Sequence, residues 1–131
     1  MYKRQGFNNY LWGIGVGWFN RQFARGLTPI ETITPGKDGS ITLATVTSLA
    51  SGTITFRPDQ PVDWTTMDGR KVTVTATLDI PNQEMTIDEV GREGHRSSRK
   101  VMKFSEDGAT MVLTLSEPQY GYTSTRTYAR L

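Results

Sequence analysis

The sequence predicts an all-β protein whose antiparallel strands follow one another along the chain. Apolar and polar residues alternate with period two in eight segments, and these segments are rich in Val, Ile, Thr and Tyr. Turn-forming residues separate the segments at intervals of about ten residues, so the connections are short. Such a meander must close into a barrel or pack as a sandwich to protect its edges.

The predicted strands begin near Pro29 and continue to the C-terminal region. They cover residues 28–34, 39–46, 52–56, 70–78, 84–90, 98–104, 110–115 and 120–128. Turn signals such as Pro35-Gly36, Asp68-Gly69 and Asp107-Gly108 lie between them.

Residues 7–27 break this rhythm. Residues there recur at the helical spacing i, i+3, i+4, i+7 in two segments. The first consists of the apolar Phe7, Tyr10, Leu11 and Ile14, and the second of Trp18 or Phe19 with Gln22, Phe23 and Leu27. Gly15 and Gly17 lie between the two segments. A short helix, a glycine turn and a second short helix are therefore expected near the start of the meander.

Composition restricts the chemistry. The chain has 131 residues, the size of one domain over residues 1–131, and it contains no cysteine and one histidine, His95. Thiol catalysis and cysteine or histidine metal sites are therefore not expected, and no cofactor is predicted. A net charge of +2 is too small to indicate nucleic-acid binding, although the fifteen Lys and Arg residues are enough for a basic face.

The apolar run at residues 10–19 has to be tested as a membrane span or a signal-peptide core. A span needs about 20 apolar residues, and this run is half that length, contains three glycines and is followed by no small-residue cleavage site. A soluble, cytoplasmic protein is the expectation, which also agrees with the lack of cysteine.

Four stretches resemble the intracellular lipid-binding protein family, which includes fatty-acid-binding and cellular retinoid-binding proteins. They are residues 7–11 with 15–17 and 21–22, residues 63–72 (Asp-Trp-Thr-Thr-Met-Asp-Gly-Arg-Lys-Val), residues 77–79, and the Thr-Arg-Thr-Tyr at 125–128. The resemblance implies an up-and-down antiparallel β-barrel of about ten strands, capped by a helix-turn-helix over about residues 7–27. Only Met1 to Gln5 precede the first helix, so the first strand is expected to be short and a neighbouring edge to be open to dimerisation by strand exchange.

A barrel of this size leaves a cavity that suits one elongated ligand. A fatty acid gains free energy from burying its chain, but its carboxylate requires a cationic, hydrogen-bonding partner. Arg126 offers a planar donor fork, and Tyr128, two residues further on, lies on the same strand face. These two residues are the predicted carboxylate anchor, and the alternative is a surface arginine beside an ordinary core tyrosine.

Further site residues are implied by the resemblance. Asp68 and Arg70 form a charged pair toward the cavity, or else a solvated ion pair at a turn. Met102 stands where fatty-acid binders often have a second arginine, with Lys100 and Lys103 beside it. The remaining predicted residues line the entry, the cap or the floor of the cavity, with plain packing as the alternative, and they are Phe7, Tyr10, Leu11, Val16, Leu49, Leu113 and Leu115.

The predicted function is an intracellular carrier that binds one long-chain fatty acid or a similar acidic lipid. A retinoid carrier, and an interaction module or strand-swapped dimer without ligand, are the alternatives. An enzyme is not expected, because His95 lies in a predicted turn without a nucleophile motif nearby. A basic outer face of the cap, from Lys3, Arg21 and Arg25, would allow transient contact with anionic membranes, or would simply be solvated.

Overall fold

The computed structural model describes residues 3–15, 29–47 and 50–131. These residues contain one helix and ten strands: β1 (Lys3–Gln5), α1 (Phe7–Gly13), β2 (Ile30–Pro35), β3 (Ile41–Val46), β4 (Ser51–Phe56), β5 (Val62–Thr65), β6 (Lys71–Asp79), β7 (Glu84–Gly91), β8 (Ser98–Phe104), β9 (Thr110–Ser116) and β10 (Thr123–Ala129). The predicted all-β class and the first predicted helix are confirmed. The second predicted helix lies outside the described residues.

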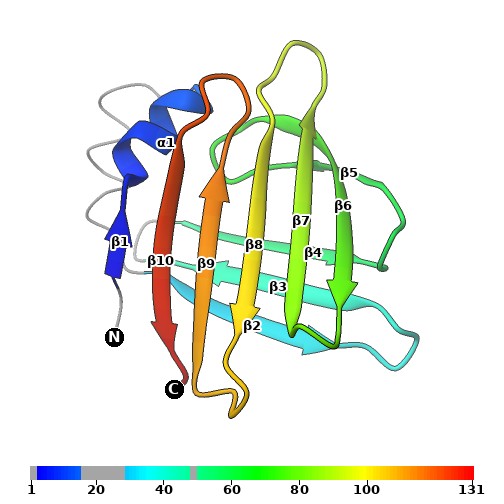
Figure 1. Cartoon of the computed structure of the whole chain (residues 1–131). Coiled ribbons are helices and arrows are strands. Elements are labelled where there is room, and N and C mark those ends of the chain that lie inside the picture. The colour runs from blue at the N-terminus through cyan, green and yellow to red at the C-terminus, as the bar shows by residue number, and fades with distance from the viewer. Residues whose placement is uncertain (1–2, 16–28, 48–49) are drawn as a thin grey trace.

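The strands form two antiparallel sheets. Seven strands pair in the order β1-β10-β9-β8-β7-β6-β5, and three pair in the order β2-β3-β4. Each strand from β5 to β10 pairs with its neighbour in the sequence, as an up-and-down meander requires. Figure 1 shows the three-stranded sheet crossing behind the larger one, with α1 beside the end of β10. The first strand is short, as predicted, and it pairs with β10 through Lys3↔Thr127.

The alternation of apolar and polar residues in the sequence places them on opposite faces of the sheets. In β6 the side chains of Val72, Val74 and Ala76 are fully buried, whereas Lys71 and Thr77 beside them face solvent. Because successive strand residues point to opposite faces, the inward positions of β6 to β9 form a mainly apolar surface, which Glu89 and Lys100 interrupt. This surface faces the smaller sheet.

Helix α1 contacts β10 near the first residues of that strand, and the apolar positions that its sequence spacing predicted face the interior. Tyr10, Leu11 and Ile14 are all buried. The helix begins after Gly6, whose φ of 68° is in the left-handed region, and a Cβ at Gly6 would overlap the carbonyl oxygen of Thr123. A glycine is therefore required where the chain turns from β1 into α1 against β10.

The sequence analysis missed one strand and placed the start of another too early. Strand β5 was absent from the expected strands, because it is only four residues long and follows Pro61. The last strand was expected from residue 120 but begins at Thr123. The preceding residues form a loop, since the carboxylate of Glu117 accepts hydrogen bonds from the backbone N–H of Tyr120 (3.0 Å) and Tyr122 (2.8 Å).

In the described part of the chain, none of the helical segments has the length and apolar character needed to cross a membrane.

Candidate ligand-binding site

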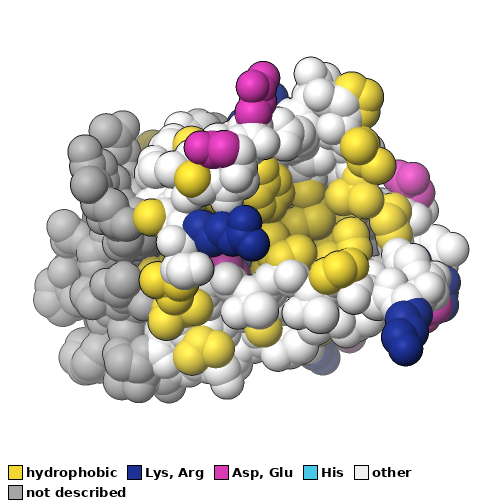
Figure 2. All heavy atoms as spheres, turned by 90° about the horizontal axis from the view of Figure 1, so that it is seen from below, with side chains coloured by type: hydrophobic (Ala, Val, Ile, Leu, Met, Phe, Trp, Pro, Cys, Tyr) yellow, Lys and Arg dark blue, Asp and Glu magenta, His cyan; other side chains and the backbone are white. Residues whose placement is uncertain are grey.

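A cavity of about 630 Å³ lies between the two sheets, within the usual size range of ligand pockets. Its wall is mainly apolar and comes from both sheets and from α1. The apolar part of the wall includes Tyr10, Leu11, Ile14, Leu43, Ile54, Trp64, Val74, Ile87, Met102, Leu113 and Leu115. Seen from the end away from α1, the molecule is hollowed and the hollow is lined with hydrophobic side chains (Figure 2).

Most of the residues predicted for the site lie in this wall. They are Tyr10, Leu11, Asp68, Arg70, Met102, Leu113, Leu115 and Arg126. Val16 and Leu49 are outside the described residues, and for Phe7 the structure describes the backbone of α1 only. Tyr128 is half-buried against the hydrophobic core and is not part of the cavity wall.

Strand register explains the position of Arg126. Arg126 on β10 is opposite Leu113 on β9, and Leu113 is opposite Met102 on β8. Directly paired residues share a face of the sheet, so these three side chains form one row along the cavity wall. The Nε atom of Arg126 and the hydroxyl oxygen of Tyr128 are both shielded from solvent. Arg126 is thus a cationic group on an apolar wall.

Asp68 and Arg70, the charged pair that the family resemblance implied, form an ion pair in the structure. The Nε of Arg70 donates to Oδ2 of Asp68 at 2.7 Å, and the Arg70 side chain is only 8% exposed. Oδ1 of Asp68 accepts from the hydroxyl of Thr66 at 2.6 Å. Both residues line the cavity, with Arg70 buried and Asp68 partly exposed to solvent.

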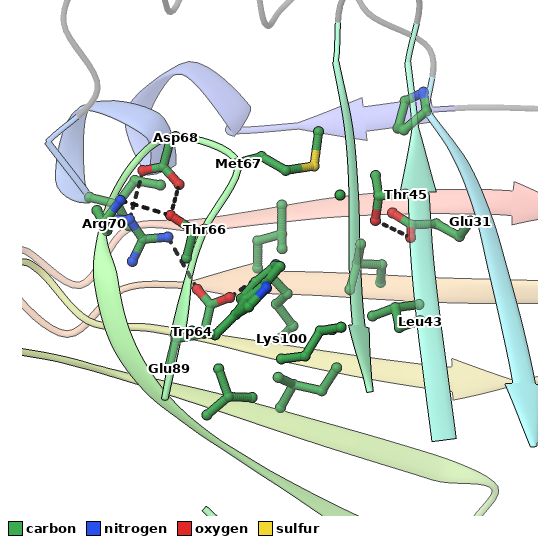
Figure 3. A pocket seen from close by; sticks show the side chains of 18 of the residues that line it. Glu31, Leu43, Thr45, Trp64, Thr66, Met67, Asp68, Arg70, Glu89 and Lys100 are labelled. Atoms are coloured by element: carbon green, nitrogen blue, oxygen red, sulfur yellow. Dashed lines mark hydrogen bonds and ion pairs between the residues drawn. The ribbon is translucent and has the colours of Figure 1, made fainter. Parts of the chain in front are cut away.

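Sequence reasoning missed the continuation of this pair into the cavity. Nη2 of Arg70 donates to Oε1 of Glu89 at 3.1 Å, and Nζ of Lys100 lies 3.2 Å from Oε2 of the same carboxylate. The hydroxyl of Ser98 donates to Oε1 of Glu89 at 2.6 Å. Asp68, Arg70, Glu89 and Lys100 are called the ion cluster below; Figure 3 shows it on one side of the cavity, with Glu31 and Thr45 on the other.

The partners of the ion cluster keep its members charged. Burial raises the pKa of Glu89, but the ammonium of Lys100 and the guanidinium of Arg70 outweigh burial and leave that pKa below its usual value. Burial lowers the pKa of Lys100, but the charge of Glu89 leaves it above its usual value. Burial likewise lowers the pKa of Arg70, and Asp68 reverses the effect. For Arg70, Glu89 and Lys100 the neighbouring charges therefore favour the ionised form.

The sequence contained a signal for Lys100 and Glu89 as residues that face the cavity. Lys100 is two positions before Met102, and period-two geometry places both on one face of β8. Glu89 is the third buried position of β7, after the apolar Met85 and Ile87 on the same face. A charged residue at an inward position predicts an oppositely charged partner on a neighbouring strand.

In the described residues, no group of His, Asp or Glu has an arrangement that would hold a metal ion. His95 is exposed in the β7–β8 loop, where its Nδ1 accepts from the backbone N–H of Lys71 at 3.2 Å. Nothing in this contact suggests a catalytic role.

An up-and-down antiparallel barrel with an apolar interior cavity and a cationic wall residue defines a class of small lipid carriers. Comparison with known proteins supports this class. The chain is 29% identical over 129 residues to a fatty acid-binding protein of Tyrophagus putrescentiae, covering 98% of this chain and 91% of the relative. It is 33% identical over 97 residues to sodium/calcium exchanger regulatory protein 1 of Doryteuthis pealeii, covering 74% of this chain and 71% of the relative. No family model matches the sequence.

Solved structures agree with these relatives. The REP1-NXSQ fatty acid transporter is 27% identical and superposes with a TM-score of 0.85 over 98% of this chain and 90% of its own. A fatty acid binding protein of Schistosoma mansoni in complex with arachidonic acid is 25% identical, with a TM-score of 0.87 over 98% and 90%. The chain belongs to the intracellular lipid-binding protein family. The named binding and transport proteins agree with the expectation that it is not an enzyme.

Proposed function

We propose that this protein is a cytoplasmic carrier that binds one long-chain fatty acid, or a similar acidic lipid, inside the cavity. The observation that carries the proposal is Arg126 on the wall of an apolar cavity between the sheets. Fatty acid-binding and transport proteins among the relatives support the same ligand class. The carrier works as a monomer, and a strand-exchanged dimer would be visible by size-exclusion chromatography.

The carboxylate is anchored by Arg126 on the cavity wall. Tyr128, two residues further along β10 and on the same face of the strand but outside the cavity wall, is the second donor of this proposal. An uncompensated carboxylate would be costly in this wall, and a guanidinium matches its two oxygens. Burial of roughly ten to twelve methylenes contributes on the order of 8 to 10 kcal/mol before ordering costs, so a micromolar to submicromolar dissociation constant is expected.

Calorimetric titration of the delipidated protein with oleate tests this function. Arg126→Ala is expected to weaken binding at least tenfold, about 1.4 kcal/mol, because the carboxylate loses its charged partner. Arg130→Ala is the matched control, since Arg130 follows the same strand and is exposed; its affinity should equal that of the wild type.

Three results would contradict the proposal. Equal oleate affinity in the Arg126 and Arg130 variants would show that Arg126 does not anchor the carboxylate. Binding of retinol in place of oleate would support the retinoid alternative. If the folded protein binds neither lipid, a role in binding a protein partner would replace the carrier function. The relative from Doryteuthis pealeii, which is named as a regulatory protein, is similar enough to make that second role worth testing.

A further inference from the structure

Lys100 is the feature of the cavity that anchoring a simple fatty acid does not use. Its side chain leaves the wall of β8 with the apolar Ile87 and Leu115 directly opposite on the neighbouring strands. It lines the cavity and remains 27% exposed. A lysine in this position places an ammonium group inside the space that the ligand would fill.

The ammonium group of Lys100 has more N–H donors than its contact with Glu89 uses. A lysine has three N–H donors, and in the described part of the chain the Nζ of Lys100 contacts one acceptor, the Oε2 atom of Glu89. Glu89 does not depend on Lys100 alone, because its other oxygen accepts from Arg70 and Ser98. Glu89 therefore holds Lys100 but has other hydrogen-bond donors as well. The remaining N–H donors of Lys100 can bond to a bound molecule.

The charge of the ion cluster argues against a second anion at this place. Two acidic residues, Asp68 and Glu89, balance two basic residues, Arg70 and Lys100. A further carboxylate would meet no excess positive charge here and would be repelled by Glu89. A plain hydrocarbon is also a poor fit, since it would displace water from the ammonium without replacing the lost hydrogen bonds.

We propose that Lys100 and Glu89 form a second, polar subsite that takes a hydroxyl or carbonyl group carried in the middle of the ligand chain. This inference rests on the proposed function, because Arg126 holds the carboxylate end. The preferred ligand class is then an oxygenated fatty acid. Lys100 donates to the ligand oxygen, while Glu89, whose Oε2 atom is shielded from solvent, holds the ammonium group in place.

The register of the sheet sets the distance between the two subsites. Lys100 is opposite Leu115 on β9, which is opposite Ser124 on β10, and Arg126 lies two residues further along β10. Two strand spacings and two residue steps separate the backbone positions of Lys100 and Arg126 by about 12 Å on a flat sheet. This separation corresponds to the middle of a long acyl chain, not to the carbons next to the carboxylate.

Oleate and ricinoleate test the subsite, because they differ only by a mid-chain hydroxyl. Wild-type protein is expected to bind ricinoleate about tenfold more tightly than oleate, as one hydrogen bond to a charged group provides. In Lys100→Met the preference should disappear, with ricinoleate weakened and oleate unchanged or tightened. Lys103→Met is the matched control: Lys103 is on the same strand but faces outward, where it donates to the carbonyl of Asn82 at 2.6 Å.

The outcomes separate this inference from the proposed function. If oleate binds in an Arg126-dependent manner but ricinoleate is no tighter, the carrier function stands and the polar subsite is wrong; ordered water would then solvate Lys100. If neither lipid binds, the carrier function itself fails. A preference that survives in Lys100→Met would also overturn the subsite. The wild-type comparison requires no variant, so it decides the question even if Lys100→Met does not fold.

Discussion

Glu89 shows how a single residue determines whether charge is tolerated inside the cavity. It is 1% exposed and bonds both Arg70 and Lys100, which lie on either side of β7. Removal of the Glu89 carboxylate would take the negative partner away from both Arg70 and Lys100. Loss of Lys100 would still leave Glu89 with hydrogen bonds from Arg70 and Ser98. The two ends of one ion pair are therefore expected to differ in their importance for stability.

Urea unfolding of Glu89→Gln and Lys100→Met tests this asymmetry. Glu89→Gln should lower the free energy of unfolding by about 3 kcal/mol, since two cations in the cavity wall lose their carboxylate. Lys100→Met should cost about 1 kcal/mol or less, because a partly buried charge is replaced by an apolar side chain of similar length. Equal losses in the two variants would contradict the assignment of Glu89 as the shared partner.

At this scale, Arg126, Met102 and the Asp68–Arg70 pair were predicted as site residues, and all of them line the cavity. The extension of this pair to Glu89 and Lys100 was not predicted, because these ion pairs join Glu89 on β7 to residues outside that strand. Glu89 and Arg70 are 19 positions apart, and only the register of β6 and β7 brings them together. A pattern read along one strand contains no information about that register.

Among the elements, the junction of β1, α1 and β10 depends on a glycine. Gly6 combines a left-handed φ with close contact to the backbone of Thr123, whereas Gly39 has a φ of 84° and a Cβ added there would meet no atom within 4 Å. Gly39 is therefore a suitable control, because it has the same left-handed backbone conformation but no close contact at the Cβ position.

Thermal or urea unfolding of Gly6→Ala and Gly39→Ala separates the two effects. Gly39→Ala should cost about 1 kcal/mol from backbone strain alone. Gly6→Ala should cost roughly 2 to 4 kcal/mol, because α1 must also move away from β10. Equal costs would mean that the contact with Thr123 does not hold the helix in place.

The loop between β9 and β10 is organised by Glu117, which is 2% exposed. Burial raises the pKa of this carboxyl, but hydrogen bonds from the N–H groups of Tyr122 and Tyr120 outweigh burial and leave the pKa below its usual value. A lowered folded-state pKa adds stability above the unfolded pKa of about 4.3, and this stability is lost as the pH falls through the folded value.

Glu117→Gln should therefore reduce stability at about pH 7 but have a smaller effect at about pH 3, where the wild-type carboxyl has lost much of this advantage. Urea midpoints at the two pH values measure the difference. A constant cost at both pH values would show that the charge of Glu117 does not support the loop.

This loop also explains why the last predicted strand began too early. The alternation from residue 120 continues that of β10, but hydrogen bonds to the Glu117 side chain give the backbone an alternative to strand pairing. Strand β5 was missed for a different reason, since four residues are too few to establish a period. Long alternating segments such as β6 and β7 were predicted to within a residue or two.

For the whole molecule, the sequence predicted the class of fold because period-two alternation and short turns leave few other arrangements. The division into sheets of seven and three strands was not predicted, because it depends on which edges remain unpaired. The cavity between them is the feature that a ligand would fill, and filling it should stabilise the folded state.

Ligand binding is expected to raise the melting temperature of the delipidated protein. At a free oleate concentration of about 100 times the dissociation constant, binding contributes about 2.7 kcal/mol to the folded state. The melting temperature should then rise by roughly 10 °C for a chain of this size. Arg126→Ala should show a smaller rise at the same concentration, and an unchanged melting temperature of the wild type would argue against binding to the native fold.

The protonation state of the bound ligand tests the central claim most directly. Oleate labelled with carbon-13 at its carboxyl group can be titrated by NMR while bound to the protein. A carboxylate beside Arg126 should remain ionised to a pH below the range in which an exposed carboxyl titrates, and Arg126→Ala should raise that pKa. A bound carboxyl whose pKa is raised in the wild type and unchanged in the variant would show that Arg126 does not anchor the ligand.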